Sequence, residues 1–578
     1  MHRRSRRPRR IAATAALATV AAVAVYVAAL PPATRVVDVT TLPPFPPGEP
    51  VMTLAGAFHV HSRQSDGGGT LDEIAAAAAA AGLDFVILTD HGDGTSRRPA
   101  SYRAGVLVVE GVEVSTDGGH YVALGLPAAP YPLGGDARGV VEDVRRLGGF
   151  GIIAHPTSPR PALAWSAWSL PADGVEWLNG DSQWRDDRPL ELLRALVGYP
   201  LRPAESLASL LARPERALAH WDDLAAERPI VGLGAADAHA RLTAGPDEGE
   251  YEGGVGMRFP WYDSIFRTFA VRVELDRSLT GDPGADEASL LGQLRAGRAY
   301  TAIDALATPV RFGFAGLTDD GQTVRMGERA AAGQGLTLSA AVAAPDDATV
   351  ILLRNGTPIA RQGGGSLAHH VVPGRAWAAY RVEVTLSTAP GSPPVPWIVS
   401  NPIYAGGSDG ASLPAVPPPE PPAAIAALPR PWRLERSMDA TATLTPRESG
   451  IRLAFELGAD ANTFAAAAYD LEPAELAGTH AVWLDVEASR PLRVSLQVRR
   501  NAPAAAGARW RRSFYAGPDR RTIRIPLDEL APVVAGMPAR PDFTGALSLL
   551  AVVDTVNTRP ESSGALVLDN LRFEPRPD

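Results

Sequence analysis

The sequence predicts a multidomain chain in which an α/β region is followed by two β-sandwiches. The chain has 578 residues, which is too many for one hydrophobic core. Between residues 51 and 305, apolar strand-like runs alternate with helical stretches, which indicates a mostly parallel sheet, an α/β barrel or a relative of one. Beyond residue 306 the apolar runs become short and are separated by turn residues, which is typical of β-sandwiches.

The first 30 residues predict a segment that targets the chain to a membrane. Six arginines and no acid precede "IAATAALATVAAVAVYVAAL", which carries no charge. As a helix, this run would be about 30 Å long, enough to cross a bilayer with the arginines on the cytoplasmic side. A signal peptide and an uncleaved anchor both fit. We favour the anchor over the signal peptide because no small-x-small cleavage site directly precedes Pro31, and a buried soluble helix is the third interpretation. The protein is therefore expected to be extracytoplasmic, membrane-anchored or secreted.

Residues 31–50 are rich in proline and predict a stiff linker before the α/β region at 51–305. Within that region, five runs predict strands: "VMTLAGAFHVH", "DFVILTDH", "VLVVEGVEVS", "FGIIAHP" and "IVGLGAADAH". Thr70 and Glu73 form a capping box before an alanine run that ends at Gly82, which predicts a helix. A second helix is expected over "ARGVVEDVRRLGG".

Residues 306–405 predict a small β-sandwich, in which Asn355-Gly356 marks a hairpin. A second proline-rich linker follows at 406–430. Residues 431–578 again contain short alternating strands, such as "HAVWLDVEA" and "LRVSLQVRR", and predict a second sandwich of the jelly-roll type.

Composition excludes several kinds of site. The chain has no cysteine, so disulfides, thiolate nucleophiles and cysteine-ligated zinc are absent. It also has no lysine, which excludes a Walker-type phosphate loop and Schiff-base chemistry. The net charge is −9 although the first 30 residues are basic, so the rest of the chain is acidic and broad binding to nucleic acid is not expected.

Six of the eleven histidines lie at or near the ends of predicted strands, where barrels of parallel strands collect their chemistry. His59 and His61 are two residues apart, so regular strand alternation would point both to one side. Glu113 lies in an apolar run, where a carboxylate needs a strong partner such as a cation. Any one of these residues could be a hydrogen-bonded core residue. Together, their crowding favours shared metal ions, and the nine candidate ligands are His59, His61, Asp66, His91, Glu113, His120, His155, Asp237 and His239.

The order of these motifs resembles the PHP (polymerase and histidinol phosphatase) superfamily of metal-dependent hydrolases. The matching segments, over about residues 53–305, are "FHVHSRQSDG", "LTDH", "GVEVS", "GGHYVALGL", "AHP" and "ADAH". "GRAYTAIDALA" and "PWIVSNPIY" further resemble its CehA/McbA-like branch, in which a β-sandwich follows the barrel.

The resemblance implies a distorted (β/α)7 barrel with two or three divalent ions, Zn²⁺, Mn²⁺ or Fe²⁺. It assigns a first ion to His59, His61, Glu113 and Asp237. Glu113 would bridge to a second ion, completed by His120 and His155. Asp66, His91 and His239 would hold a third, where Asp66 replaces the histidine of some relatives.

These expectations predict an enzyme, a hydrolase of phosphate mono- or diesters. A hydroxide bridging two ions would be the nucleophile. Glu113 and Asp237 are the predicted catalytic residues, Asp237 or a neighbouring histidine accepting the proton of the attacking water. Hydrolysis of carboxylic or carbamic esters or amides is the alternative. A protein of another class, one that chiefly binds glycans through its C-terminal sandwich, also fits, since that sandwich resembles carbohydrate-binding modules.

Other side chains are candidates for substrate contacts or further sites. Arginines close to ligand positions are candidates for binding an anionic substrate, although each could be an ordinary surface residue: Arg63, Arg97, Arg98 and Arg103. Aromatic candidates for stacking on sugars, with core packing as the alternative, are Trp432, Trp483, Trp510, Phe514 and Tyr515. His369 and His370 lack partner ligands in the sequence, and no metal is expected there.

Overall fold

The structure is a computed structural model. It describes residues 26–28, 30–40, 46–48, 50–185, 188–243, 256–407, 425–427, 430–472, 475–500, 508–533, 537–541, 543, 545 and 547–576. Within these ranges, no helix is both long enough and apolar enough to cross a bilayer. Most of the predicted signal or anchor segment, and most of the second proline-rich linker, lies outside the described residues.

The strands around the predicted site come from residues 52–302. They are β2 (Met52–Val60), β3 (Phe85–Leu88), β4 (Ser101–Arg103), β5 (Val106–Glu110), β6 (Val112–Thr116), β7 (Gly119–Leu124), β8 (Phe150–Ile153), β9 (Gly174–Asn179), β10 (Val231–Ala235), β13 (Ala270–Leu275) and β14 (Ala299–Ala302). The helices between and beside them are α2 (Leu71–Ala80), α3 (Ala137–Arg146), α4 (Gly180–Arg185), α5 (Pro189–Gly198), α6 (Pro203–Ala208), α7 (Glu215–Ala225), α8 (Tyr262–Phe266) and α9 (Pro283–Arg295).

These strands form two sheets that meet at the predicted site. In one sheet β2, β3 and β5 run parallel, and in the other β8, β9 and β10 do. Single bridges, between Val60 and Ala238 and between His91 and Glu113, join the two sheets. However, β7 is antiparallel to both β6 and β8. Only two residues connect β6 to β7, and so tight a link allows only a hairpin. The chain is β-rich, and a (β/α)7 barrel is not confirmed.

The first predicted helix is present with its cap. The hydroxyl of Thr70 accepts from Glu73 N at 3.3 Å, and the Glu73 carboxylate accepts from Thr70 N at 2.8 Å. Gly82, just past the helix, has φ +77°, a conformation that glycine adopts without steric cost. The helix signals predicted at residues 70–82 are therefore confirmed.

The strands of residues 312–405 pack as a sandwich that shares a sheet with the site region, because β14 pairs with β24. They are β16 (Phe312–Thr318), β17 (Thr323–Arg325), β18 (Arg329–Ala330), β19 (Leu336–Val342), β20 (Ala348–Arg354), β21 (Thr357–Gly363), β22 (Ser366–Val371), β23 (Ala378–Leu386), β24 (Ile398–Ser400) and β25 (Ile403–Ala405). Asn355 and Gly356 form the predicted hairpin between β20 and β21, both with positive φ. Short strands elsewhere are β1 (Arg35–Val36), β11 (Leu242–Thr243), β12 (Gly256–Met257) and β15 (Ala307–Thr308).

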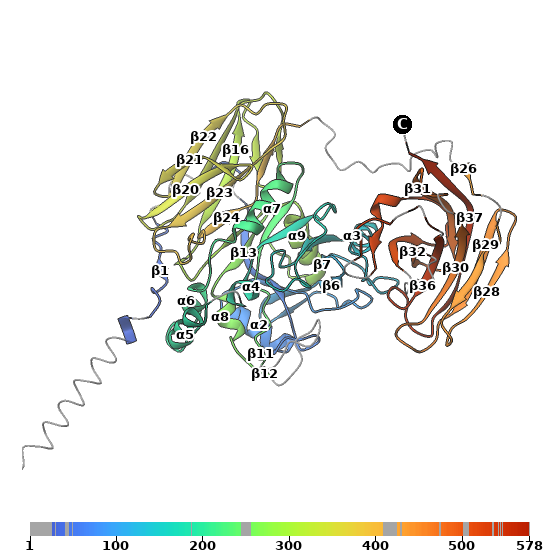
Figure 1. The fold of residues 1–578 in the computed structure, drawn as a ribbon. Helices are drawn as coiled ribbons and strands as arrows, with labels where there is room; N and C mark the ends of the chain where they lie inside the picture. Colours follow the sequence, from blue (N-terminus) through green and yellow to red (C-terminus); the bar gives the residue numbers. More distant parts are fainter. Residues whose placement is uncertain are drawn as a thin grey trace, which may run out of the picture.

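Two further sheets form the C-terminal sandwich around a separate apolar core (Figure 1). The larger elements are β28 (Thr441–Pro446), β29 (Gly450–Glu456), β30 (Phe464–Leu471), β31 (Thr479–Ala488), β32 (Leu492–Arg500), β33 (Arg509–Ala516), β34 (Arg521–Pro526), β36 (Leu547–Asp554) and β37 (Ser563–Pro575). The shorter ones are β26 (Ile425–Ala426), β27 (Arg433–Arg436), the 3-10 helix η1 (Leu527–Glu529) and β35 (Ala531–Pro532).

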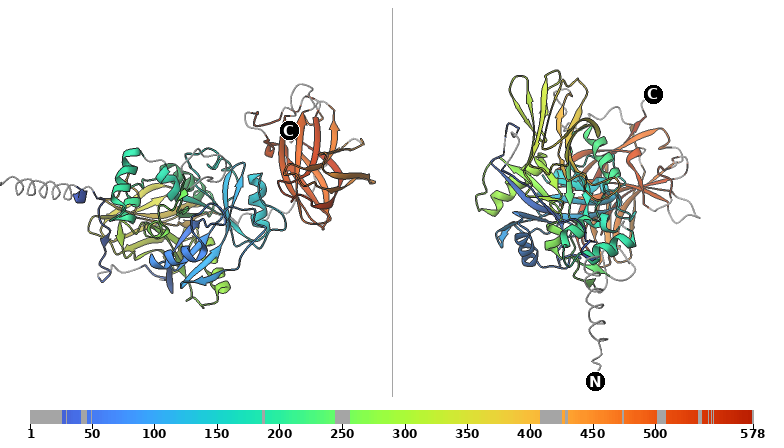
Figure 2. Two further views of the ribbon diagram at one scale, coloured as in Figure 1. Left: turned by 90° about the horizontal axis from the view of Figure 1, so that it is seen from below. Right: turned by 90° about the vertical axis from the view of Figure 1, so that its left-hand side faces the viewer.

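The C-terminal sandwich lies beside α3 (Figures 1 and 2), and charged side chains join the two. Arg493 on β32 is 3% exposed and donates to Asp143 at 3.1 Å and to Glu142 at 2.8 Å. Ser513 on β33 donates its hydroxyl to Asp136 at 2.7 Å, just before α3. The position of this sandwich relative to the site region therefore depends on a buried ion-pair network.

Candidate metal centre

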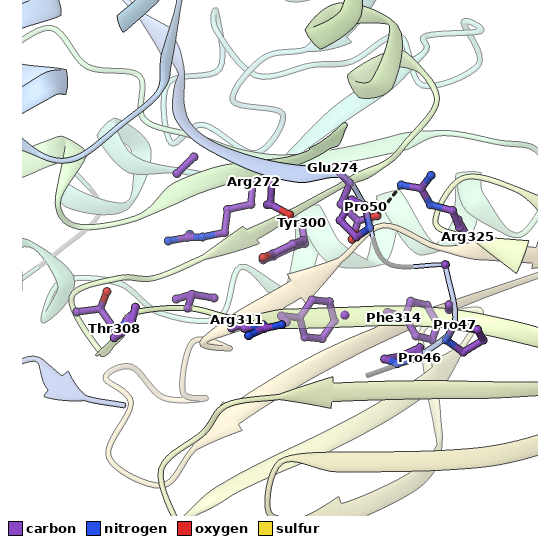
Figure 3. A pocket seen from close by; sticks show the side chains of 18 residues that line it. Pro46, Pro47, Pro50, Arg272, Glu274, Tyr300, Thr308, Arg311, Phe314 and Arg325 are labelled. Carbon is purple, nitrogen blue, oxygen red and sulfur yellow. Dashed lines mark hydrogen bonds and ion pairs between the residues drawn. The ribbon is translucent and has the colours of Figure 1, made fainter. Parts of the chain in front are cut away.

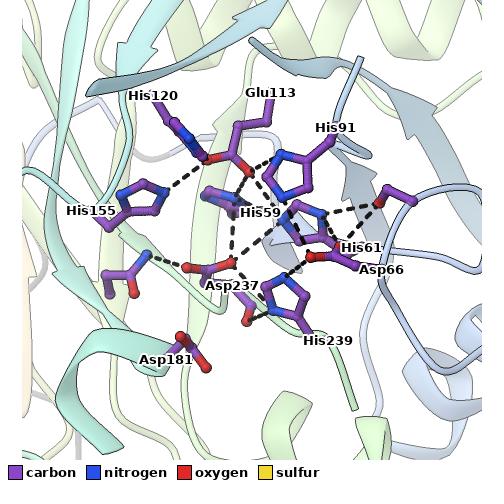
Figure 4. Close-up of polar contacts among 12 residues, drawn as sticks. His59, His61, Asp66, His91, Glu113, His120, His155, Asp181, Asp237 and His239 are labelled. Atoms are coloured by element: carbon purple, nitrogen blue, oxygen red, sulfur yellow. Dashed lines mark hydrogen bonds and ion pairs between the residues drawn. The ribbon is translucent and has the colours of Figure 1, made fainter. Parts of the chain in front are cut away.

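Eight of the nine predicted ligands lie in or next to strands, Asp66 lies in the turn between β2 and α2, and all nine converge in one cluster (Figure 4). His59 is the last residue but one of β2, and its backbone has φ +63°. The pairing of β2 with β3 shifts register between Phe58 and Val60. The two imidazoles do lie on one side, as expected, but regular strand alternation is not the reason. A bulge with a left-handed residue turns the two imidazoles toward each other.

Two more of the predicted ligands also have left-handed backbones. Asp237 has φ +46° and His155 has φ +26°. Such conformations cost roughly 1–3 kcal/mol each for residues other than glycine, and they gather at functional sites. Three strained residues in one cluster indicate that the positions of these side chains reduce the stability of the folded chain.

His59, His61 and Asp237 form one group of possible metal ligands. The Nε2 atoms of His59 and His61 are 3.1 Å apart, and each lies 3.5 Å from Oδ1 of Asp237. The Glu113 Oε2 atom is 2.9 Å from His59 Nε2 and 3.2 Å from His61 Nε2. These are the four residues that the resemblance assigns to a first ion.

Glu113 carries a second set of contacts on its other oxygen. Its Oε1 atom is 2.8 Å from Nδ1 of His120 and 2.8 Å from Nε2 of His155. His91 approaches from the opposite side, with Nδ1 3.5 Å from Glu113 Oε2. One group that could hold an ion here contains His91, Glu113 and His120, and His155, which the resemblance assigns to this ion, also contacts Glu113.

Asp66 is the centre of the third group. Its Oδ1 atom is 3.3 Å from His61 Nδ1, while Oδ2 is 3.3 Å from His239 Nε2 and 3.5 Å from His91 Nε2. His61 and His239 stack with ring centroids 4.2 Å apart. Asp66 is thus positioned with the two predicted partners, and His61 joins them.

The donor set fits divalent cations. In the part of the chain that the structure describes, eight of the nine residues fall into three groups whose ligand atoms lie within 4.8 Å of one another. The Nε2 atoms of His59 and His61 face each other and also face the carboxylates of Glu113 and Asp237. One proton between the two nitrogens cannot satisfy all of these groups, whereas a cation can. Imidazole and carboxylate donors in such groups suit Zn²⁺, Mn²⁺ or Fe²⁺.

The electrostatics of the cluster point the same way. Burial alone would lower the pKa of His59, but Asp237, Glu176 and Glu113 outweigh it and raise that pKa well above its ordinary value. Burial would raise the pKa of Glu113, but His59, His91 and His120 outweigh it and hold that pKa well below the usual range. The site therefore favours ionised carboxylates beside positive charge, and a metal cation can take the place of the imidazole protons.

Glu176 on β9 supports the cluster from behind, and the sequence analysis missed it. Its Oε1 atom accepts from His59 Nδ1 at 2.5 Å, and Oε2 accepts from His155 N at 2.6 Å. Asn179 Nδ2 donates to Glu176 at 2.8 Å and to Asp237 at 3.0 Å. The signal that identified Glu113, an acid within an apolar run, was also present at "VEWLN".

The substitution Glu176→Gln is expected to weaken metal binding and kcat/KM by about 10- to 100-fold, because it removes the charge that orients His59. Metal titration and steady-state kinetics would measure both. Glu287→Gln is the matched control, since Glu287 is also buried but pairs with Arg97. Equal effects of the two substitutions would contradict a positioning role for Glu176.

The entrance to the cluster is lined by polar residues that the sequence analysis did not single out. A small pocket of about 40 Å³ has Asp66, His91, Glu113, His120, His155, Asp237 and His239 in its wall, together with Ser158, Arg160, Leu163, Asp181, Ser182 and Arg185. The four arginines proposed from the sequence do not line this pocket. Their side chains contact other groups, such as Glu287 for Arg97, Glu110 for Arg98 and Asp72 for Arg103.

A larger cavity of about 450 Å³ lies elsewhere, next to β2, β13, β14 and β16 (Figure 3). Arg272, Tyr300 and Arg325 are in its wall, and none of the nine predicted ligands is. Arg272 is paired with Asp304 at 2.5 Å. We place the candidate site at the smaller pocket, because the imidazole and carboxylate groups that could bind a metal ion line it.

The remaining candidates occupy other surroundings. Trp510 and Phe514 are buried in the core of the C-terminal sandwich, and Trp483 is buried beside Glu574 and Arg524, so none of the three is available to stack on a sugar. Tyr515 lies between the guanidinium groups of Arg146 and Arg521, at 3.8 and 4.4 Å from its ring. Trp432 borders a surface hollow of about 660 Å³. His369 and His370 lie on β22, and neither belongs to a ligand group among the described residues.

Comparison with known proteins gives distant structural neighbours. No family model and no curated protein matches the chain. A family 11 carbohydrate-binding module from Clostridium thermocellum, in complex with a mixed-linked tetrasaccharide, covers 25% of the chain and 88% of its own length at 13% identity and a TM-score of 0.22. A two-domain protein from Bacteroides vulgatus, which contains a predicted PHP-like metal-dependent phosphoesterase, covers 62% of the chain and 99% of its own length. Its identity is 14% and its TM-score 0.28. Similarity this low does not establish an activity, which must be argued from the residues.

Proposed function

We propose that the chain is a metal-dependent phosphoesterase of the PHP type that acts on phosphate mono- or diesters. The observation that carries the proposal is the position of Glu113, whose two oxygens each contact imidazoles of a different ligand set. A structural ion pair would not need five histidines around one buried carboxylate. The two bridges that join the site's sheets are consistent with a distorted barrel, which belongs to the same proposal.

The groups described above would hold the ions. Bound divalent ions would activate water and offset the charge that develops on the phosphoryl oxygen. Glu113 would keep the ligand sets together, and Glu176 would hold the imidazole of His59 in the tautomer with its proton on Nδ1. Burial would raise the pKa of Asp237, but the histidines around it hold that pKa well below the usual range, so the carboxylate is ionised and can bind a cation or orient the attacking water by accepting its hydrogen bond.

The entrance favours an anionic substrate. Arg160 and Arg185 both line the pocket, and Arg185 forms an ion pair with Asp181 there. Guanidinium groups bind phosphate oxygens through charge-assisted hydrogen bonds. Neutral carboxylic or carbamic esters would gain nothing from these two side chains, which is why the phosphoester is preferred over that alternative.

Metal content and a substrate panel test the proposal. The full chain, purified in detergent, would be analysed for bound metal and then assayed with phosphate monoesters, diesters and carboxylic esters, each with added Mn²⁺ or Zn²⁺. We expect turnover of phosphoesters that a chelator abolishes and added metal restores. Bound metal with turnover of carboxylic esters alone would favour the alternative hydrolase, and no metal with no turnover would refute both.

Removing the guanidinium of Arg160 or of Arg185 by substitution with alanine is expected to lower kcat/KM for phosphoesters by about 10- to 100-fold, the loss of one charged hydrogen bond. Turnover of a neutral ester should change little. Arg103→Ala is the control, because Arg103 pairs with Asp72 outside the pocket. Equal losses on charged and neutral substrates would show that these arginines serve the fold rather than the substrate.

A further inference from the structure

Among the residues that the structure describes, one surface is apolar and largely exposed. Helix α5 fully buries only Ala195 and Gly198. The apolar side chains that remain on the helix and just after it are 38–60% exposed: Leu190, Leu192, Leu193, Leu196, Val197 and Leu201. We call these six residues, together with Trp261, the α5 surface.

Trp261 joins the helix through Tyr199, the residue that ends α5. The backbone N–H of Trp261 donates to the Tyr199 hydroxyl at 3.0 Å, and the indole is 65% exposed. Scattered single apolar residues are normal on a protein surface, but a contiguous group on one helix marks a contact with another apolar phase. Leucines beside an exposed tryptophan are typical of helices that lie in a membrane interface.

Contacts of the N-terminal chain with α5 and α6 suggest a partner for this surface. Tyr26 donates its hydroxyl to the Val197 carbonyl on α5 at 2.8 Å. Eight residues later, Thr34 donates through its hydroxyl to Glu205 on α6 at 3.0 Å. The uncharged run "IAATAALATVAAVAVYVAAL", long enough to cross a bilayer, ends at Leu30 between these two contacts. Figure 1 shows α5 and α6 at the margin of the fold where residues 26–28 reach it.

We propose that the N-terminal segment anchors the chain in a membrane and that the α5 surface lies in the outer face of this membrane. The contacts of Tyr26 and Thr34 hold the end of the predicted span against α5 and α6. The surface of the bilayer would therefore lie next to the exposed leucines of α5. Arg188 and Arg194, both exposed on or beside α5, would reach lipid phosphates. The helix would then lie in the plane of the interface with its leucines among the upper acyl chains.

This contact also bears on access to the metal centre, though it does not depend on the proposed hydrolysis. Helix α4 carries Asp181 and Arg185 to the entrance of the site, and α5 begins four residues after Arg185. The entrance and the membrane contact are therefore on neighbouring elements of the chain.

Because the chain has no cysteine, single-cysteine variants can report on chosen positions. The full chain would be reconstituted in vesicles of phosphatidylethanolamine and phosphatidylglycerol with an environment-sensitive fluorophore at Leu193→Cys or Leu196→Cys. The control is Gln362→Cys, on the exposed strand β21 of the first sandwich. We expect blue-shifted emission and quenching by brominated lipid tails at 193 and 196, and quenching by aqueous iodide at 362.

Two outcomes would overturn the proposal. Quenching by iodide at 193 and 196, without quenching by lipid, would show that α5 faces water. Protection from both quenchers would show that protein covers α5, either the N-terminal segment or a second copy. Far-ultraviolet circular dichroism of each labelled variant would show that the fold is kept, so a negative result cannot be attributed to unfolding.

Discussion

Replacing Glu113 by glutamine is expected to lower kcat/KM for phosphoester hydrolysis by about 10³-fold or more and to reduce the metal content of the purified chain. The amide keeps the shape of the side chain but removes the charge that faces the imidazoles of two ligand sets. Loss of several kcal/mol of charge stabilisation at a metal site corresponds to a rate change of this size. Steady-state kinetics and elemental analysis of the same preparation would measure both effects.

The matched control is Glu110→Gln, three residues earlier in the chain. Glu110 is the last residue of the buried strand β5, but its carboxylate pairs with Arg98 at 2.7 Å and lies outside the ligand cluster. We expect metal content and activity close to wild type for this variant. If Glu113→Gln keeps full metal content and activity, the proposed role of Glu113 is wrong.

The sequence was most informative where a residue that can bind a metal interrupts or ends an apolar run. An acid within an apolar run, as at Glu113, and histidines that end apolar runs, as at His91 and His155, are rare enough to be noticed without a structure. The structure brings these three residues together in one cluster. The capping box at Thr70 was equally local, because both partners lie within four residues.

What the sequence could not show depends on contacts between distant segments. The left-handed backbone at His59 arises where β2 meets the chain after β10, through the bridge of Val60 with Ala238. Arg160 and Arg185 are brought to the pocket by loops and helices whose positions no local pattern predicts. The pairing of β14 with β24, which continues the sheet across the predicted boundary at residue 305, joins residues about 100 positions apart.

The substitution Arg493→Met is expected to destabilise the docking of the C-terminal sandwich by about 3–5 kcal/mol, the cost of removing one partner from a buried ion pair. Arg493 holds both Asp143 and Glu142 of α3, and Asp143 is itself buried. Methionine would fill much of the volume but leave the Asp143 carboxylate with fewer donors. In a region of about 150 residues, a loss of this size lowers the midpoint of thermal unfolding by roughly 10 °C.

Differential scanning calorimetry of the full chain would resolve this effect, and Arg499→Met supplies the comparison on the same strand. Arg499 pairs with Glu435 at 2.6 and 2.7 Å, but both lie within the C-terminal sandwich and both side chains are 21% exposed. Exposed pairs contribute at most about 1 kcal/mol, so the transition should move by only a few degrees. Similar shifts of the unfolding midpoint for the two variants would mean that burial of Arg493 against α3 adds nothing to the stability of the docked sandwich. A much larger shift for Arg493→Met would show that the sandwich is held on α3 by a buried charge.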